Sequence, residues 1–166
     1  MKLARTGIIA AAVLAISSLA FAQAKPDFSG AWTLDPEASQ MGGAPGGGAG
    51  GQGRGQGMGM GGPMIVKQTA DTLTVERTAG ENKIVMTYKL DGTESVNKQT
   101  MGQMGEVEIK AVAKWDGDKL VITEKRPGRD GAMQESTQTW SLEGGNLSIE
   151  RTGGRGASKQ VYKKTT

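Results

Sequence analysis

The sequence has no cysteine and no histidine, and aromatic side chains make up only 4% of its 166 residues. Without cysteine the protein has neither a disulfide nor a thiolate nucleophile, so we expect its stability to come from packing. Without histidine it lacks the usual general base, and the two absences together remove the nitrogen and sulfur ligands that zinc prefers. We therefore expect a protein that is not an enzyme and needs no cofactor.

The sequence also has little net charge. Lys and Arg number 20 and Asp and Glu number 17, for a formal charge of +3. Setting aside Lys2 and Arg5, which lie in the N-terminal segment discussed next, leaves 18 basic against 17 acidic side chains. The balance gives no electrostatic case for a nucleic acid or a membrane surface as partner.

The N-terminal segment has the pattern of a secretory signal peptide. It starts with positive residues, continues with an apolar run over residues 8–19, and ends in two overlapping small-x-small sites within 20–24. The run is short for a membrane anchor, which is the alternative interpretation. We expect residues 1–22 to be removed and 23–166 to form one periplasmic or secreted domain, without stable membrane insertion after cleavage.

A glycine-rich tract separates the first apolar segment from the rest of the chain. Thirteen of the 22 residues in 41–62 are glycine. The tract does not lead into the Lys-Ser/Thr and helix of a phosphate-binding loop, and Arg54 alone is too little for RNA binding. Glycine-rich chain is costly to order and buries no face, so we interpret 41–62 as a flexible loop.

The remaining sequence alternates apolar and polar residues in short stretches separated by Gly and Asp-Gly turn signals. In 106–115, for example, Val107, Ile109, Ala111 and Ala113 fall on the face opposite to four charged residues. Such alternation indicates strands with one buried face, and Asp-Gly favours hairpins. The strand around Trp32 is expected to end at Pro36. The other predicted strands are 64–69, 72–78, 83–90, 94–100, 106–115, 119–126, 132–142, 146–151 and 159–164.

These segments predict an all-β fold. Short links between successive strands favour an antiparallel up-and-down meander, and closure into a barrel removes the exposed edges. We expect a barrel of about 8–10 strands, with the glycine-rich loop after the first, and keep a two-layer sandwich as the alternative.

The stretch Gly30-Ala31-Trp32 at the first strand resembles the G-x-W motif of the lipocalin superfamily. The surrounding residues, from Phe28 to Asp35, resemble the opening of small secreted bacterial lipocalin-like proteins, many of unassigned function. The resemblance implies that Trp32 closes the barrel floor, often beneath an arginine from a late strand. Arg151 or Arg126 is then expected to take that place.

The same resemblance implies that a small, mostly apolar molecule binds inside the barrel. Tyr88 lies on the apolar face of its predicted strand, and Trp115 and Trp140 lie late in theirs, so these three are the candidate ligand-binding residues. The competing interpretation is a structural or interaction protein in which Trp115 and Trp140 fill the core and leave no room for a ligand.

Methionines give a further alternative. Met58, Met60 and Met64 have a spacing that suits soft metal ions through their thioethers, which would make the chain a Cu(I)- or Ag(I)-binding periplasmic protein. The competing interpretation is that Met fills irregular apolar gaps. We therefore predict no metal site, with this trio as the alternative.

Overall fold

The computed structural model describes residues 25–40, 62–79, 82–100, 105–128, 130–154 and 156–165. Residues 1–22, which are predicted to be a signal peptide, and most of the glycine-rich tract lie outside these ranges. The described residues contain ten strands, and among them there is no helix long and apolar enough to cross a membrane. The strands are β1 (Gly30–Gln40), β2 (Met64–Gln68), β3 (Thr72–Ala79), β4 (Asn82–Lys89), β5 (Glu94–Thr100), β6 (Glu106–Asp116), β7 (Lys119–Pro127), β8 (Met133–Glu143), β9 (Asn146–Gly153) and β10 (Gly156–Lys164).

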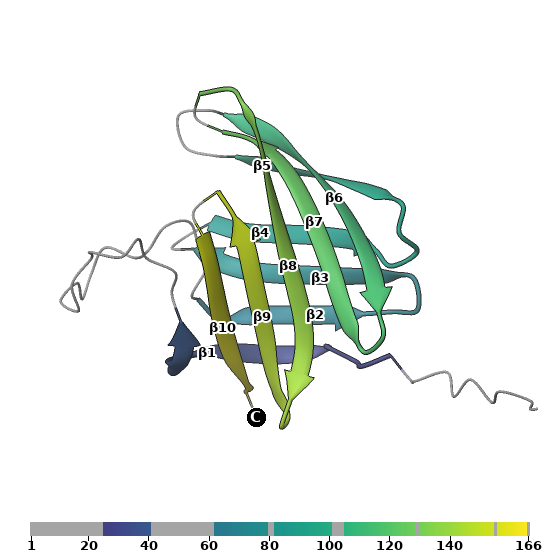
Figure 1. Ribbon diagram of the computed structural model, residues 1–166, viewed down its shortest axis with the longest axis vertical. Coiled ribbons are helices and arrows are strands. Elements are labelled where there is room, and N and C mark those ends of the chain that lie inside the picture. The colour runs from purple at the N-terminus through teal and green to yellow at the C-terminus, as the bar shows by residue number, and fades with distance from the viewer. Residues whose placement is uncertain are drawn as a thin grey trace, which may run out of the picture.

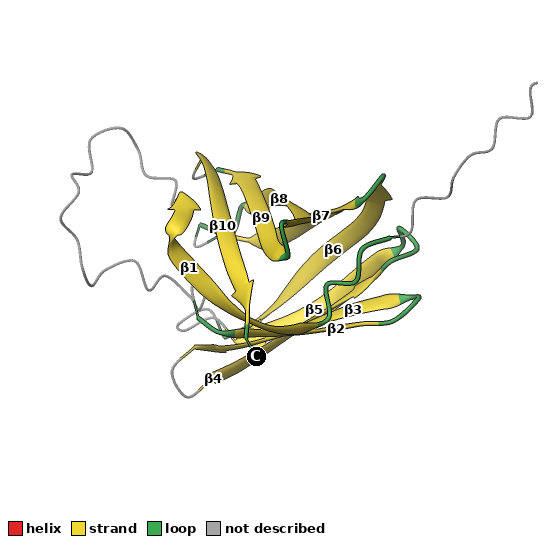
Figure 2. Ribbon diagram, turned by 90° about the horizontal axis from the view of Figure 1, so that it is seen from below, coloured by secondary structure: helices red, strands yellow, loops and turns green. Residues whose placement is uncertain are grey.

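The strands form one antiparallel sheet that curls into a nearly closed barrel. Its order is β4-β3-β2-β1-β10-β9-β8-β7-β6-β5, so the first strand pairs with the last (Figures 1 and 2). In that pairing Trp32 lies opposite Lys164 and Leu34 opposite Tyr162. The predicted all-β meander barrel is therefore confirmed, and the sandwich is not observed.

The alternation of apolar and polar residues places one face of each strand inside the barrel. On β6, Val107, Ile109, Ala111 and Ala113 are buried, whereas most of the residues between them are exposed. The same inward alternation on β7 carries Leu120 and then Ile122, Glu124 and Arg126. A buried apolar core thus runs along the inside of the sheet, interrupted at a few positions by polar side chains.

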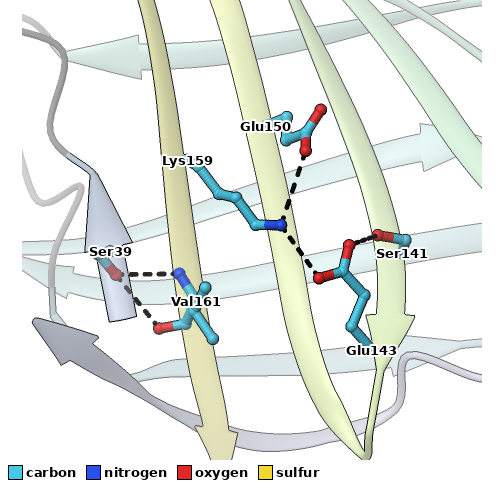
Figure 3. A network of polar contacts seen from close by, with 6 residues as sticks. All are labelled: Ser39, Ser141, Glu143, Glu150, Lys159 and Val161. Carbon is cyan, nitrogen blue, oxygen red and sulfur yellow. Dashed lines mark hydrogen bonds and ion pairs between the residues drawn. The ribbon is translucent and has the colours of Figure 1, made fainter. Parts of the chain in front are cut away.

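The first strand is longer than expected. β1 continues past Pro36 to Gln40, and its register with β10 shifts between Asp35 and Gln40. Proline cannot donate a ladder hydrogen bond, and strands tolerate it at such irregular positions. Within this stretch the Ser39 hydroxyl accepts a hydrogen bond from Val161 N–H at 3.0 Å, so a side chain holds β1 to β10 where the ladder is interrupted (Figure 3).

One predicted hairpin is not formed. The turn at Asp91-Gly92 joins β4 to β5, but within the described residues no backbone ladder links these two strands. Side chains of β5 bond to β4 instead: Ser95 to the Lys89 amide and Asn97 to Thr87. We call this contact between β4 and β5 the seam. The Asp-Gly signal correctly predicts the local turn, but strand pairing beyond it depends on how the two strands diverge.

Candidate functional site

Aromatic side chains close one end of the barrel interior. Phe28 is fully buried, and its ring stacks on Trp115 with centroids 5.9 Å apart and meets Trp140 edge-on at 5.8 Å. Such pairs contribute about 0.5–1.5 kcal/mol each beyond the area they bury. Two of the three candidate ligand-binding residues, Trp115 and Trp140, therefore pack into an aromatic floor, which is the place that the filled-core interpretation gives them.

The segment before β1 is hooked into the floor by hydrogen bonds. Gln68 at the end of β2 accepts from Phe28 N–H at 3.0 Å and donates to the Pro26 carbonyl at 3.0 Å. The indole N–H of Trp32 donates to the Phe28 carbonyl at 2.9 Å. These bonds turn the chain before β1 inward, so that the Phe28 ring is buried at this end of the barrel.

The cation placed over the Trp32 ring is Lys164, whose Nζ lies 5.6 Å from the ring centroid. Trp32 itself is 2% exposed, as the G-x-W resemblance implies for a floor residue. Arg151 lies opposite Ser158 on β10, six positions from Lys164, which is about 20 Å along a strand. The structure thus gives Lys164, rather than Arg151, the place beside Trp32, and sets Arg151 further along the barrel.

Tyr88, the third candidate residue, lies at that other level of the barrel. Its hydroxyl donates a 2.6 Å hydrogen bond to Glu124 Oε1, and both side chains are buried. Burial, followed by the nearby charge of Glu124, raises the pKa of Tyr88 well above its ordinary value. Tyr88 is therefore a hydrogen-bond donor, and Glu124 is a carboxylate held inside the barrel by a neutral partner.

Arg151 interacts electrostatically with this carboxylate and with two other arginines. Burial lowers the pKa of Arg151, the charge of Glu124 opposes that shift, and Arg77 and Arg126 add to it by repulsion. Arg77 also donates to the Tyr162 hydroxyl at 3.1 Å and lies 5.7 Å from the centroid of that ring. The carboxylate of Glu124 and the guanidinium groups of Arg77, Arg126 and Arg151 thus belong to one electrostatically connected level of the barrel. We call Arg77, Tyr88, Glu124, Arg126 and Arg151 the polar level.

Buried amide side chains lie beside both the polar level and the aromatic floor. The Tyr162 hydroxyl donates to Gln160 Oε1 at 3.3 Å, and the Trp140 indole donates to Gln138 Oε1 at 3.3 Å. Both glutamines are buried and come from β8 and β10. Buried amides retain further donors and acceptors, so this part of the interior can orient a polar group.

The inward position of Tyr88 is predicted from the sequence, but its partners Glu124 and Arg77 are not. Glu124 follows Leu120 and Ile122 at spacing two, so the alternation that identifies the buried face already places this carboxylate inside. Arg77 follows Leu73 and Val75 in the same way. A charged residue at an inward position of an alternating strand is the signal that could have found both.

Of the alternative soft-metal trio, the structure describes only Met64. Met64 is 1% exposed and belongs to the core on β2, where its thioether packs rather than faces a loop. Met58 and Met60 lie outside the described residues. Among the residues that are described, no three His, Cys, Asp or Glu side chains form a metal-binding group.

Comparison with known proteins identifies the fold. No protein-family profile matches the sequence, and no curated protein matches it. Among solved structures, a point mutant of the fluorescent protein UnaG is 23% identical with a TM-score of 0.56, covering 84% of this chain and 96% of that one. The REP1-NXSQ fatty acid transporter is 16% identical with a TM-score of 0.54, covering 83% and 96%.

Human cRBP IV is also similar, at 18% identity and a TM-score of 0.55, covering 84% of this chain and 99% of that one. Each of these identities is too low to carry function across. The three likenesses, together with the strand order above, show that this chain has the fold of a nearly closed, lipocalin-like β-barrel.

Proposed function

We propose that this protein is an exported binding protein that holds a small, mostly apolar molecule inside its barrel, with an acidic end group of that molecule at the polar level. The export part of the proposal rests on the signal-peptide pattern of residues 1–22. The observation that carries the binding part is the interior itself, in which apolar walls surround a small set of buried polar groups. This combination is typical of sites for small ligands.

The walls favour an apolar ligand body. The inward positions of β6 near the seam are Ile109, Ala111 and Ala113, and the two alanines leave more of the interior unfilled than larger side chains would. The interior of a barrel also widens as strands are added beyond the eight whose own side chains can fill it. Burying a hydrocarbon against such walls contributes about 0.8 kcal/mol per CH₂ group.

The charges favour an acidic end group. Arg151 is influenced electrostatically by one buried carboxylate, Glu124, and by two further guanidinium groups, those of Arg77 and Arg126, and burial disfavours its charge. An arginine keeps its proton in proteins, so the local surplus of positive charge persists at neutral pH. A carboxylate on the ligand would offset that surplus and accept hydrogen bonds from guanidinium groups, which bind carboxylates well. The name of one structural neighbour, a fatty acid transporter, agrees with this ligand class.

A matched series of ligands tests the proposal. Dodecanoate, dodecanol and dodecylamine share one chain and differ in the end group, and binding is followed by intrinsic tryptophan fluorescence and by calorimetry. We expect saturable binding with dodecanoate at least tenfold tighter than dodecanol, about 1.4 kcal/mol, and with dodecylamine weakest. Arg151→Gln should remove the preference for the acid. Lys125→Gln, a change on the exposed face of β7, should leave it intact.

Two results would contradict the proposal in different ways. If none of the three compounds binds saturably, the barrel is a filled core, and the aromatic floor formed by Phe28, Trp115 and Trp140 is part of that filling. If all three bind with the same affinity, the interior holds apolar molecules but the polar level does not select an acid.

A further inference from the structure

Among the neighbouring strands of the described barrel, only β4 and β5, which form the seam, have no backbone ladder between them, and side chains take its place. Each of the other neighbouring pairs in the sheet order is registered residue against residue, for example β3 with β4 from Thr72 to Ala79. At the seam, Asn97 Oδ1 accepts from Thr87 N–H at 2.8 Å and Asn97 Nδ2 donates to the Thr87 carbonyl at 3.0 Å. The Asn97 amide thus takes the place of a peptide group on a neighbouring strand.

The side chains that close the seam become longer away from the connecting turn. Ser95, nearest the turn, accepts from Lys89 N–H through its hydroxyl at 2.8 Å. Asn97 reaches Thr87, and Gln99, the longest of the three, donates to the sulfur of Met86 at 2.8 Å. Figure 1 shows β4 and β5 lying further apart away from their turn. The series Ser, Asn, Gln at spacing two therefore matches the widening distance between two splayed strands.

This arrangement makes the seam the easiest part of the wall to open. Parting it breaks side-chain hydrogen bonds from three residues, and the hydroxyl and amide groups released are readily solvated. Parting a laddered pair such as β6 and β7 would break a run of backbone bonds from Lys110 to Asp116 and expose both strand edges. The pivot is already present, because residues 90–93 form a turn in which Asp91 Oδ1 accepts from Thr93 N–H at 2.8 Å.

The short ladder between β1 and β2 is the other candidate opening, and it is closed by different means. Its register covers only Gly30 to Trp32. However, Gln68 N–H donates to the Ser29 hydroxyl at 3.0 Å, and the Gln68 side chain holds Pro26 and Phe28. Opening there would pull the buried Phe28 ring out of the aromatic floor, which the seam does not require.

We propose that the seam is the gate through which small molecules enter the barrel, with β4 and β5 swinging apart about the 90–93 turn and the side chains of Ser95, Asn97 and Gln99 acting as its latch. The role of the seam in ligand entry rests on the proposed function, but its opening can be measured on the protein without a ligand. Tyr88 lies between the two latched amides of β4, at Thr87 and Lys89, so gate and polar level share one strand.

A single introduced thiol tests the gate without any ligand. The sequence has no cysteine, and Ala111 is 1% exposed on β6 opposite Ser95, so Ala111→Cys gives one buried thiol beside the seam. We expect N-ethylmaleimide to modify it about tenfold faster when Asn97→Leu is added, the effect of losing one to two net hydrogen bonds. Ser95→Ala, nearest the pivot, should accelerate the reaction less, and it serves as the milder variant if Asn97→Leu does not fold.

The matched control is Ser39→Ala, which removes a hydroxyl that also holds a strand amide, that of Val161, but at the β1–β10 join (Figure 3). It should leave the modification rate unchanged. The rates are measured with and without low urea, because modification through global unfolding rises steeply with denaturant whereas local opening does not. Equal rates in the Asn97→Leu and Ser39→Ala variants, or a steep urea dependence in both, would overturn the gate.

Dodecanoate uptake, followed by stopped-flow tryptophan fluorescence, then links the gate to function. The association rate should rise about tenfold with Asn97→Leu, by the same loss of one to two net hydrogen bonds, and stay unchanged with Ser39→Ala. If dodecanoate does not bind at all, the proposed function fails while the thiol result still decides whether the seam opens. If dodecanoate binds but its association rate is the same in the wild type and in Asn97→Leu, the seam is not the route of entry, even if the thiol experiment shows that it opens.

Discussion

The Tyr88 hydroxyl on β4 and the Glu124 carboxylate on β7 meet inside the barrel at 2.6 Å, 36 positions apart in the sequence. Both side chains are buried. Tyr88→Phe removes the donor and leaves a buried carboxylate oxygen with one partner fewer, so we expect the free energy of unfolding in urea to fall by about 1–3 kcal/mol. The control Thr74→Val deletes an exposed 3.4 Å hydroxyl contact with Thr87 and should change stability by less than about 0.5 kcal/mol. Equal losses in the two variants would contradict a structural role for the buried pair.

Alkaline pH tests the same pair in another way. Burial, then Glu124, raises the pKa of Tyr88 well above its ordinary value of 10.0. The unfolded chain therefore loses this proton first, and the associated stability is complete below about pH 10 and is lost as the pH rises toward the folded-state pKa. We expect the unfolding free energy to fall between about pH 10 and 11, by at most about 1.4 kcal/mol per pH unit from this group. In Tyr88→Phe the fall should be shallower, and an identical slope in both proteins would contradict the assignment.

Phe28 should be among the most sensitive positions of the core. Its fully buried ring contacts Trp115 and Trp140, so Phe28→Ala leaves a cavity at the barrel floor and should lower the unfolding free energy by about 3–5 kcal/mol. Phe28→Leu keeps most of the volume and should cost clearly less. Denaturation followed by tryptophan fluorescence measures both, and a loss below about 1 kcal/mol in Phe28→Ala would show that residues 25–29 do not close the floor.

The outer surface should behave differently. Lys159 Nζ lies 3.0 Å from Glu143 Oε2 and 3.7 Å from Glu150 Oε1 across β8, β9 and β10, with Ser141 also bonded to Glu143 (Figure 3). The hydrogen bond from Lys159 holds the pKa of Glu143 below its usual range. Because both carboxylates are more than half exposed, Lys159→Met should cost no more than about 1 kcal/mol at pH 7.

The sign of the pH effect at this network follows from the lowered pKa. A carboxyl group of this kind contributes stability above its unfolded pKa and loses it as the pH falls through its folded pKa. The difference between the wild type and Lys159→Met should therefore disappear in acid, and NMR titration of the variant should show the Glu143 pKa returning upward. An unchanged Glu143 titration would mean that the lysine is not its partner in solution.

Much of the fold could be predicted because it rests on local patterns. Period-two alternation in segments such as Glu106–Asp116 fixes which face is buried, and Gly117 with a φ of 62° makes the turn that the Asp-Gly pair predicts. The failure at Asp91-Gly92 has the same origin. A turn signal specifies only the few residues of the turn, whereas pairing along β4 and β5 depends on the splay of two strands, which only the closed sheet determines.

The site could be predicted less well, because it is assembled from distant strands. The inward position of Tyr88 is visible in the sequence, but its meeting with Glu124 depends on the curvature of the whole sheet. Likewise, Lys164 lies over Trp32 because β1 pairs with β10, a register that the alternating pattern alone does not set. In the sequence, Ser95, Asn97 and Gln99 have only the pattern of a weak strand. Their contacts across the seam are apparent only in the structure.

Binding inside the barrel is tested most directly by finding which residues a bound molecule contacts. Methyl NMR spectra recorded during a dodecanoate titration separate the two faces of the sheet. Ile109 and Ile122 are buried inside, whereas Ile65, Val85 and Val96 are 47%, 41% and 52% exposed on the outside. We expect saturable shifts at the inner methyl groups, with the outer ones unmoved. Shifts confined to the outer methyl groups, or none at all, would contradict binding within the barrel.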